Sequence, residues 1–356
     1  MTASELAHHR LVNQQLATSK FKTAKEVVGW MCAMQAQDYQ MAKWGIGVRL
    51  SDTNEATIEQ AINRGEIIRT HVMRPTWHFV LAEDLQWMIE LTAPHINSSI
   101  KSSQKKMGLD VPLFKKTNSI IEKALRGHKH LTRDEIMVEL NKSKINPDPI
   151  QGIHIMMDAE LSGIICSGPM RGKQFTYALT DERVSKTKKI KRDEALAELA
   201  LRYFTSHAPA TLQDFMWWSG LPAAVAKAAL DSVMPQLQQD KIENKIYLGK
   251  YFEKTNHDSE RVYFLPSFDE FMISYKDRSA TLDSKNYDST ITRNGIFKPI
   301  IVANGKAIGI WSRAIVKNKV VIEPKFFRAK DKLKKSELKN VLEKYGRFLD
   351  KNIEIK

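Results

Sequence analysis

The chain has 356 residues, 42% of them hydrophobic, which is enough for two or three domains with packed cores. No stretch approaches about 18 consecutive apolar residues, and the N-terminus has no basic start followed by an apolar run, so we expect neither a membrane span nor a secretory signal. The 55 lysine and arginine residues outnumber the 41 acidic residues and give a net charge of +14. These features argue against a membrane or secreted protein and predict a basic protein of the cytoplasm.

The basic residues are concentrated in three parts of the chain: residues 101–130, residues 183–192 and the tail from Lys325 onward. The run 183–192 (RVSKTKKIKR) has six basic residues, Lys188 and Lys189 among them, and no acidic one. A single run of this kind is as often a solvated face or a linker. Three runs in one chain favour a polyanionic partner, most simply nucleic acid.

Cysteine and histidine usage gives no sign of a metal site. Cys32 and Cys166 are far apart in sequence, and we expect them to be buried, small hydrophobic side chains and not a disulfide. The ten histidines have no partners at the spacing of a zinc site. We therefore expect neither a metal nor a cofactor.

Residues 1–130 form the first predicted domain. Apolar residues at helical spacing predict four helices within residues 4–65. Two alternating strands follow at 66–73 and 76–82, joined by a tight turn at Arg74-Pro75. Helices followed by a two-stranded hairpin are typical of a winged helix.

Two further segments repeat this plan. In residues 131–192, Thr132 and Glu135 predict a capping box, and a later hairpin presents Arg171 and Lys173 at a basic tip suited to phosphate contacts. In residues 193–257, a helix that starts near Thr211, a turn and a second helix have the order of a DNA-binding helix-turn-helix. A plain helical hairpin is nearly as compatible with that spacing.

From residue 258 the apolar pattern changes to alternation with period two. Antiparallel strands with a hairpin turn at Asn304-Gly305 predict a small β-barrel over residues 258–330. Residues 331–356 predict an amphipathic helix that packs on the barrel. The predicted fold class is therefore α+β.

The common catalytic signatures GxSxG, HExxH, CxxC and GxGxxG do not occur in the sequence. Their absence argues against acyl transfer, zinc hydrolysis, thiol–disulfide exchange and dinucleotide binding. Two unusual polar blocks remain, MQAQDY at 34–39 and HVMRPTWHFV at 71–80.

These blocks, together with FMWWSGL and FLPSFDEFMISYKDRS followed by NGIFKPIIVANG, resemble in the same order the winged-helix DNA glycosylases of the AlkZ and YcaQ type. The resemblance runs from roughly Leu6 to Phe348. It implies three tandem winged-helix motifs and a C-terminal β-barrel, C-shaped around a basic DNA channel, and the removal of alkylated purines from DNA. It also implies a Gln-x-Gln or Gln-x-Asp catalytic motif, which here reads Gln35-Ala36-Gln37 and is similar to the AlkZ branch.

Two glutamines can perform this chemistry because the leaving group is activated already. An N7-alkylated purine carries a positive charge, so its departure needs a positioned water more than a strong base. A glutamine carbonyl oxygen accepts a hydrogen bond from that water, and its dipole favours the cationic sugar that develops. We predict that Gln35 and Gln37 are catalytic, although an ordinary solvated turn is the simpler alternative. Asp38 is either a base for the water or the N-cap of the following helix.

The remaining candidates are residues that contact DNA. Arg74 and His78 belong to the block Arg74-Pro75-Thr76-Trp77-His78, which is comparable to one in the family, and His78 is equally compatible with a structural role. Arg278 lies in the FDEFMISYKDRS block, where it either holds the barrel's shape or positions DNA. The tryptophans nearby favour core packing over base stacking.

The sequence thus predicts a monomeric, monofunctional DNA glycosylase that acts on N7-alkylated purines in double-stranded DNA, including interstrand crosslinks, in the cytoplasm at the nucleoid. One alternative is a winged-helix DNA-binding protein without catalysis, such as a regulator that binds a two-fold site as a dimer. Another is a degenerate family member that binds damaged DNA without excising the base.

Overall fold

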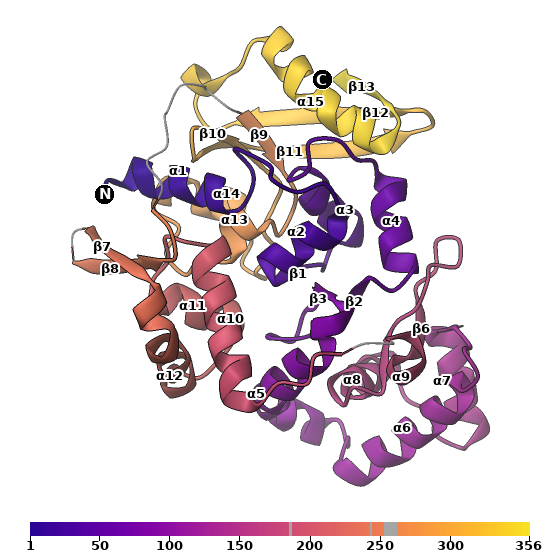
Figure 1. The fold of residues 1–356 in the computed structure, drawn as a ribbon. Coiled ribbons are helices and arrows are strands. Elements are labelled where there is room, and N and C mark those ends of the chain that lie inside the picture. The colour runs from indigo at the N-terminus through magenta and orange to yellow at the C-terminus, as the bar shows by residue number, and fades with distance from the viewer. Residues whose placement is uncertain (185–186, 243, 253–261) are drawn as a thin grey trace. The chain divides into compact units, whose positions relative to one another are not determined.

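The computed structural model describes residues 1–184, 187–242, 244–252 and 262–356, which form two compact units (Figure 1). Unit 1 comprises Met1–Glu59, Ala197–Trp218 and Ala223–Lys356, and unit 2 comprises Gln60–Leu196 and Ser219–Pro222. The predicted domain boundary at 257/258 lies outside the described residues. Helices and strands are mixed in both units, so the α+β class is confirmed. Within the described ranges, no helix has the length and apolar character needed to cross a membrane.

Unit 2 contains two β-hairpins and a group of helices. Its strands are β2 (Ile67–His71), β3 (Trp77–Leu81), β4 (Leu131–Thr132), β5 (Ile165–Ser167) and β6 (Thr176–Leu179). Its helices are η1 (Ala82–Asp84), α5 (Leu85–Lys106), α6 (Val111–Leu125), α7 (Arg133–Lys142), α8 (Pro149–Leu161) and α9 (Thr180–Arg183). The antiparallel pairs β2/β3 and β5/β6 confirm the two predicted hairpins, including the turn at Arg74-Pro75.

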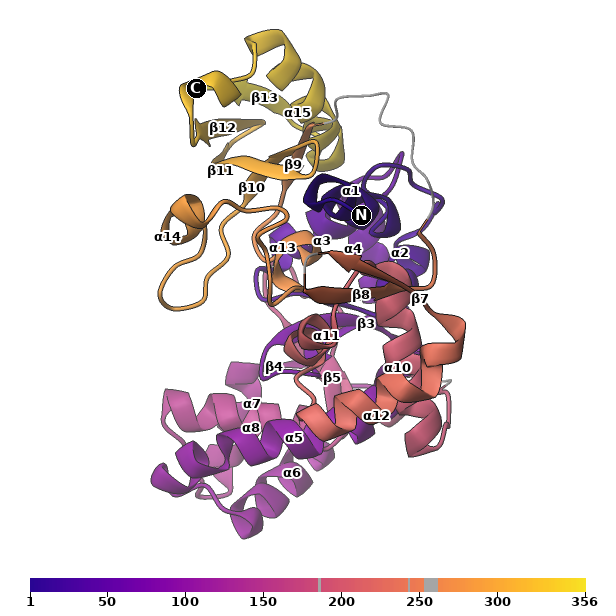
Figure 2. The same cartoon turned by 90° about the vertical axis from the view of Figure 1, so that its left-hand side faces the viewer.

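The helices of unit 2 enclose a hydrophobic core. Helices α6, α7 and α8 lie against one another (Figure 2), and their buried apolar residues form one cluster with residues of β5 and β6. The capping box predicted at the start of α7 is present, because Thr132 accepts the Glu135 N–H and Glu135 accepts the Thr132 N–H. The second hairpin is thereby held on the helices that precede it in sequence.

Unit 1 begins with short helices, the first two of which start at a capping box. The elements before the last sheet are α1 (Ala3–Asn13), α2 (Ala24–Met31), β1 (Ala33–Gln35), α3 (Tyr39–Gly47), α4 (Glu55–Asn63), α10 (Arg192–Ser206), α11 (Leu212–Ser219), α12 (Ala223–Val233), η2 (Met234–Gln236), β7 (Gln238–Ile242) and β8 (Lys245–Gly249). Helix α4 continues into unit 2, α10 begins there, and α11 ends there. Thr2 with Glu5, and Thr23 with Glu26, cap α1 and α2 by the same Thr-x-x-Glu arrangement that starts α7.

The C-terminal part of unit 1 is a five-stranded sheet in the order β13-β12-β11-β10-β9. Its elements are β9 (Val262–Leu265), α13 (Glu270–Ile273), η3 (Ser284–Asn286), α14 (Tyr287–Thr290), β10 (Ile300–Ala303), β11 (Lys306–Val316), β12 (Lys319–Phe326), η4 (Ala329–Asp331), α15 (Lys335–Leu349) and β13 (Asn352–Ile355). The hairpin turn at Asn304-Gly305 is confirmed, with φ of 49° and 79°. A closed barrel needs its first and last strands to pair. In the described residues β9 and β13 are instead the two edges of an open sheet.

The final helix packs as its apolar stripe predicts. Leu342, Tyr345 and Phe348 of α15 are at most 1% exposed, and α15 lies beside the C-terminal sheet in Figure 1. The ring centroids of Trp44 and Phe348 are 5.1 Å apart. A Cβ added to Gly47 would lie 2.6 Å from the Phe348 ring, so the glycine allows α3 and α15 to approach closely. This packing fixes α3, the helix that follows the MQAQDY block.

Candidate active site

The MQAQDY block forms a corner between a short strand and a helix. Directly after α2, Cys32 turns the chain into β1 with φ 65° and ψ −52°. A positive φ is uncommon for a residue other than glycine, and it persists where the surrounding structure fixes the backbone. The corner ends at Asp38, whose carboxylate accepts the Met41 N–H at 3.1 Å and caps α3. The capping role predicted for Asp38 is thereby confirmed.

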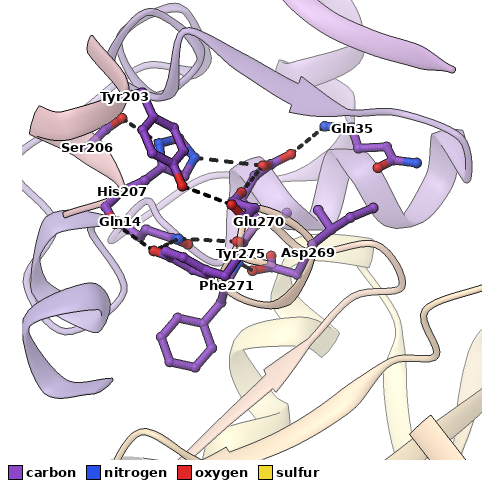
Figure 3. Close-up of polar contacts among 12 residues, drawn as sticks. Gln14, Gln35, Tyr203, Ser206, His207, Asp269, Glu270, Phe271 and Tyr275 are labelled. Carbon is purple, nitrogen blue, oxygen red and sulfur yellow. Dashed lines mark hydrogen bonds and ion pairs between the residues drawn. The ribbon is translucent and has the colours of Figure 1, made fainter. Parts of the chain in front are cut away.

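The two glutamines occupy different parts of this corner. Gln35 is the last residue of β1 and is 7% exposed, whereas Gln37 lies two residues later and is exposed. The backbone N–H of Gln35 donates to Glu270 Oε1 at 2.6 Å, and its side chain extends away from that carboxylate (Figure 3). The corner therefore presents one buried and one exposed amide within three consecutive residues.

A narrow pocket lies beside Gln35. Its walls are β1, the α3 residues Ala42 and Gly45, and the loop 266–270. Its volume of about 10 Å³ is close to what one water molecule requires. The pocket is thus at the lower limit of the space that one water needs, and Gln35 is one of its lining residues.

Glu270 is a buried carboxylate next to the motif. It is 2% exposed; its Oε2 accepts the Ser274 hydroxyl and lies 3.7 Å from His207 Nε2. Burial raises the pKa of Glu270, but the facing His207 imidazole, the Ser274 hydroxyl and the Gln35 N–H outweigh it and lower the pKa to about 2. The carboxylate is therefore ionised at neutral pH.

His207 completes this group from the segment after α10. It is fully buried, and burial lowers its pKa, which favours the neutral imidazole at neutral pH. Its Nδ1 lies 2.8 Å from Ser206 Oγ, and its Nε2 faces Glu270. A proton on Nε2 is the arrangement that avoids placing a lone pair against the ionised carboxylate.

An ion pair holds the loop that carries Glu270. Arg49 is 0% exposed and contacts both carboxylate oxygens of Asp269, at 2.8 and 2.9 Å. Its other donors reach the Gly45 carbonyl and two oxygens of Gln14. Asp269 in turn caps α13 by accepting the Phe271 N–H at 2.9 Å. The pair therefore fixes the start of the helical turn whose first residue is Glu270.

Six of the predicted DNA-contact residues belong to unit 2. Arg171, Lys173, Lys188 and Lys189 are exposed, so their charges are accessible to a phosphate. Arg171 contacts Glu135 at 2.5 Å, and Lys188 Nζ lies 3.5 Å from Asp84. Arg74 is half-buried in the turn between β2 and β3.

His78 and Arg278 are more buried than a phosphate contact requires. His78 is 1% exposed, and its Nδ1 lies 2.9 Å from the Thr76 carbonyl oxygen. Arg278 is 8% exposed, donates from Nε to the Met272 carbonyl and lies over the ring of Trp217. For both residues these contacts favour the structural alternative over direct binding of DNA.

The family model "DNA glycosylase AlkZ-like" matches residues 28–348, a range that includes the corner, His207 and Glu270. A curated relative, the interstrand DNA cross-link repair glycosylase of Streptomyces sahachiroi, is 22% identical over 336 residues, 88% of each chain. The solved structure of the Streptomyces sahachiroi DNA glycosylase AlkZ matches with a TM-score of 0.84 over 100% of both chains, at 19% identity. That structure shares the fold of this chain.

Proposed function

Because this chain belongs to the AlkZ-like DNA glycosylase family, we propose that the N-glycosidic bonds it hydrolyses are those of N7-alkylated purines in double-stranded DNA. The observation that carries this proposal is the corner itself. It has two glutamine amides within three residues, and the first of them, Gln35, lines a pocket of about one water's volume. An amide is a sufficient water-positioning group only for a leaving group that is already activated.

In the proposed reaction, Gln35 and Gln37 orient one water toward the anomeric carbon C1′. The bond from C1′ to the purine N9 breaks, its electron pair neutralises the cationic base, and the water adds to the oxocarbenium-like sugar and loses a proton to solvent. The amide oxygens accept hydrogen bonds from the water, and their dipoles favour the positive charge on the sugar. An amide donates no proton to an unmodified base, so the same site discriminates against undamaged purines.

We extend the proposal to interstrand crosslinks joined through N7 of purines. The Streptomyces sahachiroi relative is named for interstrand DNA cross-link repair. A purine alkylated at N7 is the same cationic leaving group whether the alkyl chain ends freely or joins a second strand. We propose that the protein acts as a monomer at the nucleoid and needs neither a metal nor a cofactor. We also propose that its helix-and-hairpin segments are three winged helices that bind the duplex.

The wild-type protein is expected to release N7-methylguanine from a duplex under single-turnover conditions and to leave undamaged purines in place. Released base is measured by chromatography, with a duplex that carries an N7-linked interstrand crosslink as the second substrate. Release from either duplex supports the glycosylase. Binding to both duplexes without release from either would replace the proposal with a DNA-binding protein that has lost catalysis.

Changing Lys173 to glutamine is expected to weaken binding of undamaged duplex and to flatten its salt dependence. Each lost phosphate contact reduces the slope of log K against log salt concentration by about 0.9. Fluorescence anisotropy at several salt concentrations measures the slope. The control is Lys142→Gln, which removes another exposed lysine of unit 2, one that pairs with Glu139. An equal change in both variants would mean that Lys173 acts only through net charge.

A further inference from the structure

We propose that Glu270 is a positioning residue for this reaction: its carboxylate fixes the backbone of Gln35 and thereby aims the Gln35 amide at the water. The inference rests on the proposed role of Gln35. It adds a residue at the start of α13, which lies 235 positions away in the chain.

The contacts of Glu270 are those of a group held in place from several sides. Oε1 accepts the Gln35 N–H at 2.6 Å, Oε2 accepts the Ser274 hydroxyl and faces His207 Nε2 at 3.7 Å, and the main-chain oxygen accepts from Gln14 Nε2 at 3.2 Å (Figure 3). Hydrogen bonds to an ionised acceptor are shorter and stronger than those between neutral groups. The end of β1 is therefore tied to a carboxylate that is itself fixed.

Packing alone does not account for a carboxylate at this position. The other residues of α13 are Phe271, Met272 and Ile273, all apolar and at most 3% exposed. A buried charge is costly unless hydrogen bonds satisfy it, and an apolar side chain would fill the same space more easily. Among the contacts that the charge adds, the one at the catalytic corner is the bond to the backbone of Gln35, a residue that lines the one-water pocket.

Fixing the Gln35 backbone fixes the origin of its side chain. A displacement of about 1 Å of a positioned group can reduce a rate by roughly 100-fold. An amide at residue 270 keeps an acceptor oxygen for the Gln35 N–H. It is a weaker acceptor, however, and its NH₂ group faces the Ser274 hydroxyl and the His207 ring. Glu270→Gln is therefore expected to leave the fold intact and to loosen the corner.

A double-mutant cycle tests the inference. Wild type, Gln35→Ala, Glu270→Gln and the double variant are compared for single-turnover release of N7-methylguanine, and the maximal rate constant and the half-saturating enzyme concentration are measured separately. Glu270→Gln is expected to lower the rate constant by about 10- to 100-fold, with half-saturation unchanged. In the Gln35→Ala background it is expected to cause no further loss, because Glu270 acts through Gln35.

The cycle separates failure of the inference from failure of the proposed function. If Gln35→Ala leaves the rate unchanged, the proposed role of Gln35 fails, and the inference fails with it. If Gln35→Ala is slow while Glu270→Gln matches wild type, only the positioning role is overturned. The positioning role would also be overturned if the fold loss in rate constant of the double variant equalled the product of the two single losses. That result would mean that the charge of Glu270 acts on the sugar directly.

Two further variants keep the test decisive. Glu160→Gln removes another buried carboxylate, 2.5 Å from His71 Nδ1 in unit 2, and is expected to keep the wild-type rate constant. A loss equal to that of Glu270→Gln would overturn the inference. If Glu270→Gln fails to fold by circular dichroism, Ser274→Ala replaces it in the cycle. It removes one donor to Oε2, and its smaller loss is expected to vanish in the Gln35→Ala background.

Discussion

Replacing Gln35 and Gln37 together by alanine is expected to slow base release by about 100- to 1,000-fold while binding of the duplex persists. This is the size of effect that removal of a preorganised hydrogen-bonding group has at other active sites. Both amides lie on one corner, and Gln35 borders a pocket with room for one water. The measurement is single-turnover release of N7-methylguanine at saturating protein, with affinity for the same duplex measured in parallel.

Two neighbouring variants control for disturbance of the corner. Gln40→Ala removes an exposed amide from the first turn of α3 and is expected to release base at the wild-type rate. Asp38→Asn keeps an acceptor for the Met41 N–H, so the cap of α3 is retained, and a rate near wild type is expected. A loss confined to Asp38→Asn, with the glutamine variants fully active, would make Asp38 the base and return the glutamines to an ordinary turn.

Local sequence patterns predicted the structure correctly wherever residues that are close in the chain determine it. The Thr-x-x-Glu pattern at Thr132 predicted the start of α7, because both partners of a capping box lie within four residues. Asn304-Gly305 predicted the β10/β11 turn, since both residues tolerate positive φ. A prediction that does not depend on neighbouring residues is also confirmed, since Cys32 and Cys166 are buried thiols and not a disulfide.

Long-range contacts account for what sequence patterns missed. Glu270 and His207 reach the corner from positions 235 and 172 residues beyond Gln35, and no periodicity links such distant residues. The only available signal was that Glu270 lies inside a block that resembles the family. Arg278 is a residue that the sequence suggested as a DNA contact because of its charge. In the fold its guanidinium lies over the ring of Trp217. Alternation likewise predicted strands but carried no information on closure of the sheet, nor on β13, which pairs with β12 in parallel.

Replacing Arg49 by methionine is expected to lower the free energy of unfolding by about 3–5 kcal/mol, the cost of leaving one partner of a buried ion pair uncompensated. All five N–H donors of Arg49 have acceptors, and two of them bind Asp269 in the bidentate geometry that lysine cannot reproduce. Urea unfolding followed by tryptophan fluorescence measures the change. The signal reports mainly on unit 1, where five of the seven tryptophans lie, namely Trp30, Trp44, Trp217, Trp218 and Trp311.

The origin of the loss is tested by removing the partner's charge as well. Asp269→Asn keeps an oxygen to cap α13, so Arg49→Met combined with Asp269→Asn is expected to be more stable than Arg49→Met alone. The surface control is Arg328→Met, because Arg328 also binds both carboxylate oxygens of an aspartate, Asp331, through Nε and Nη2 while it is 59% exposed. Its effect is expected to be much smaller, since exposed pairs are screened by water. Equal losses at Arg49 and Arg328 would contradict the burial argument, and with it the role of the Arg49–Asp269 pair in holding Glu270 beside the corner.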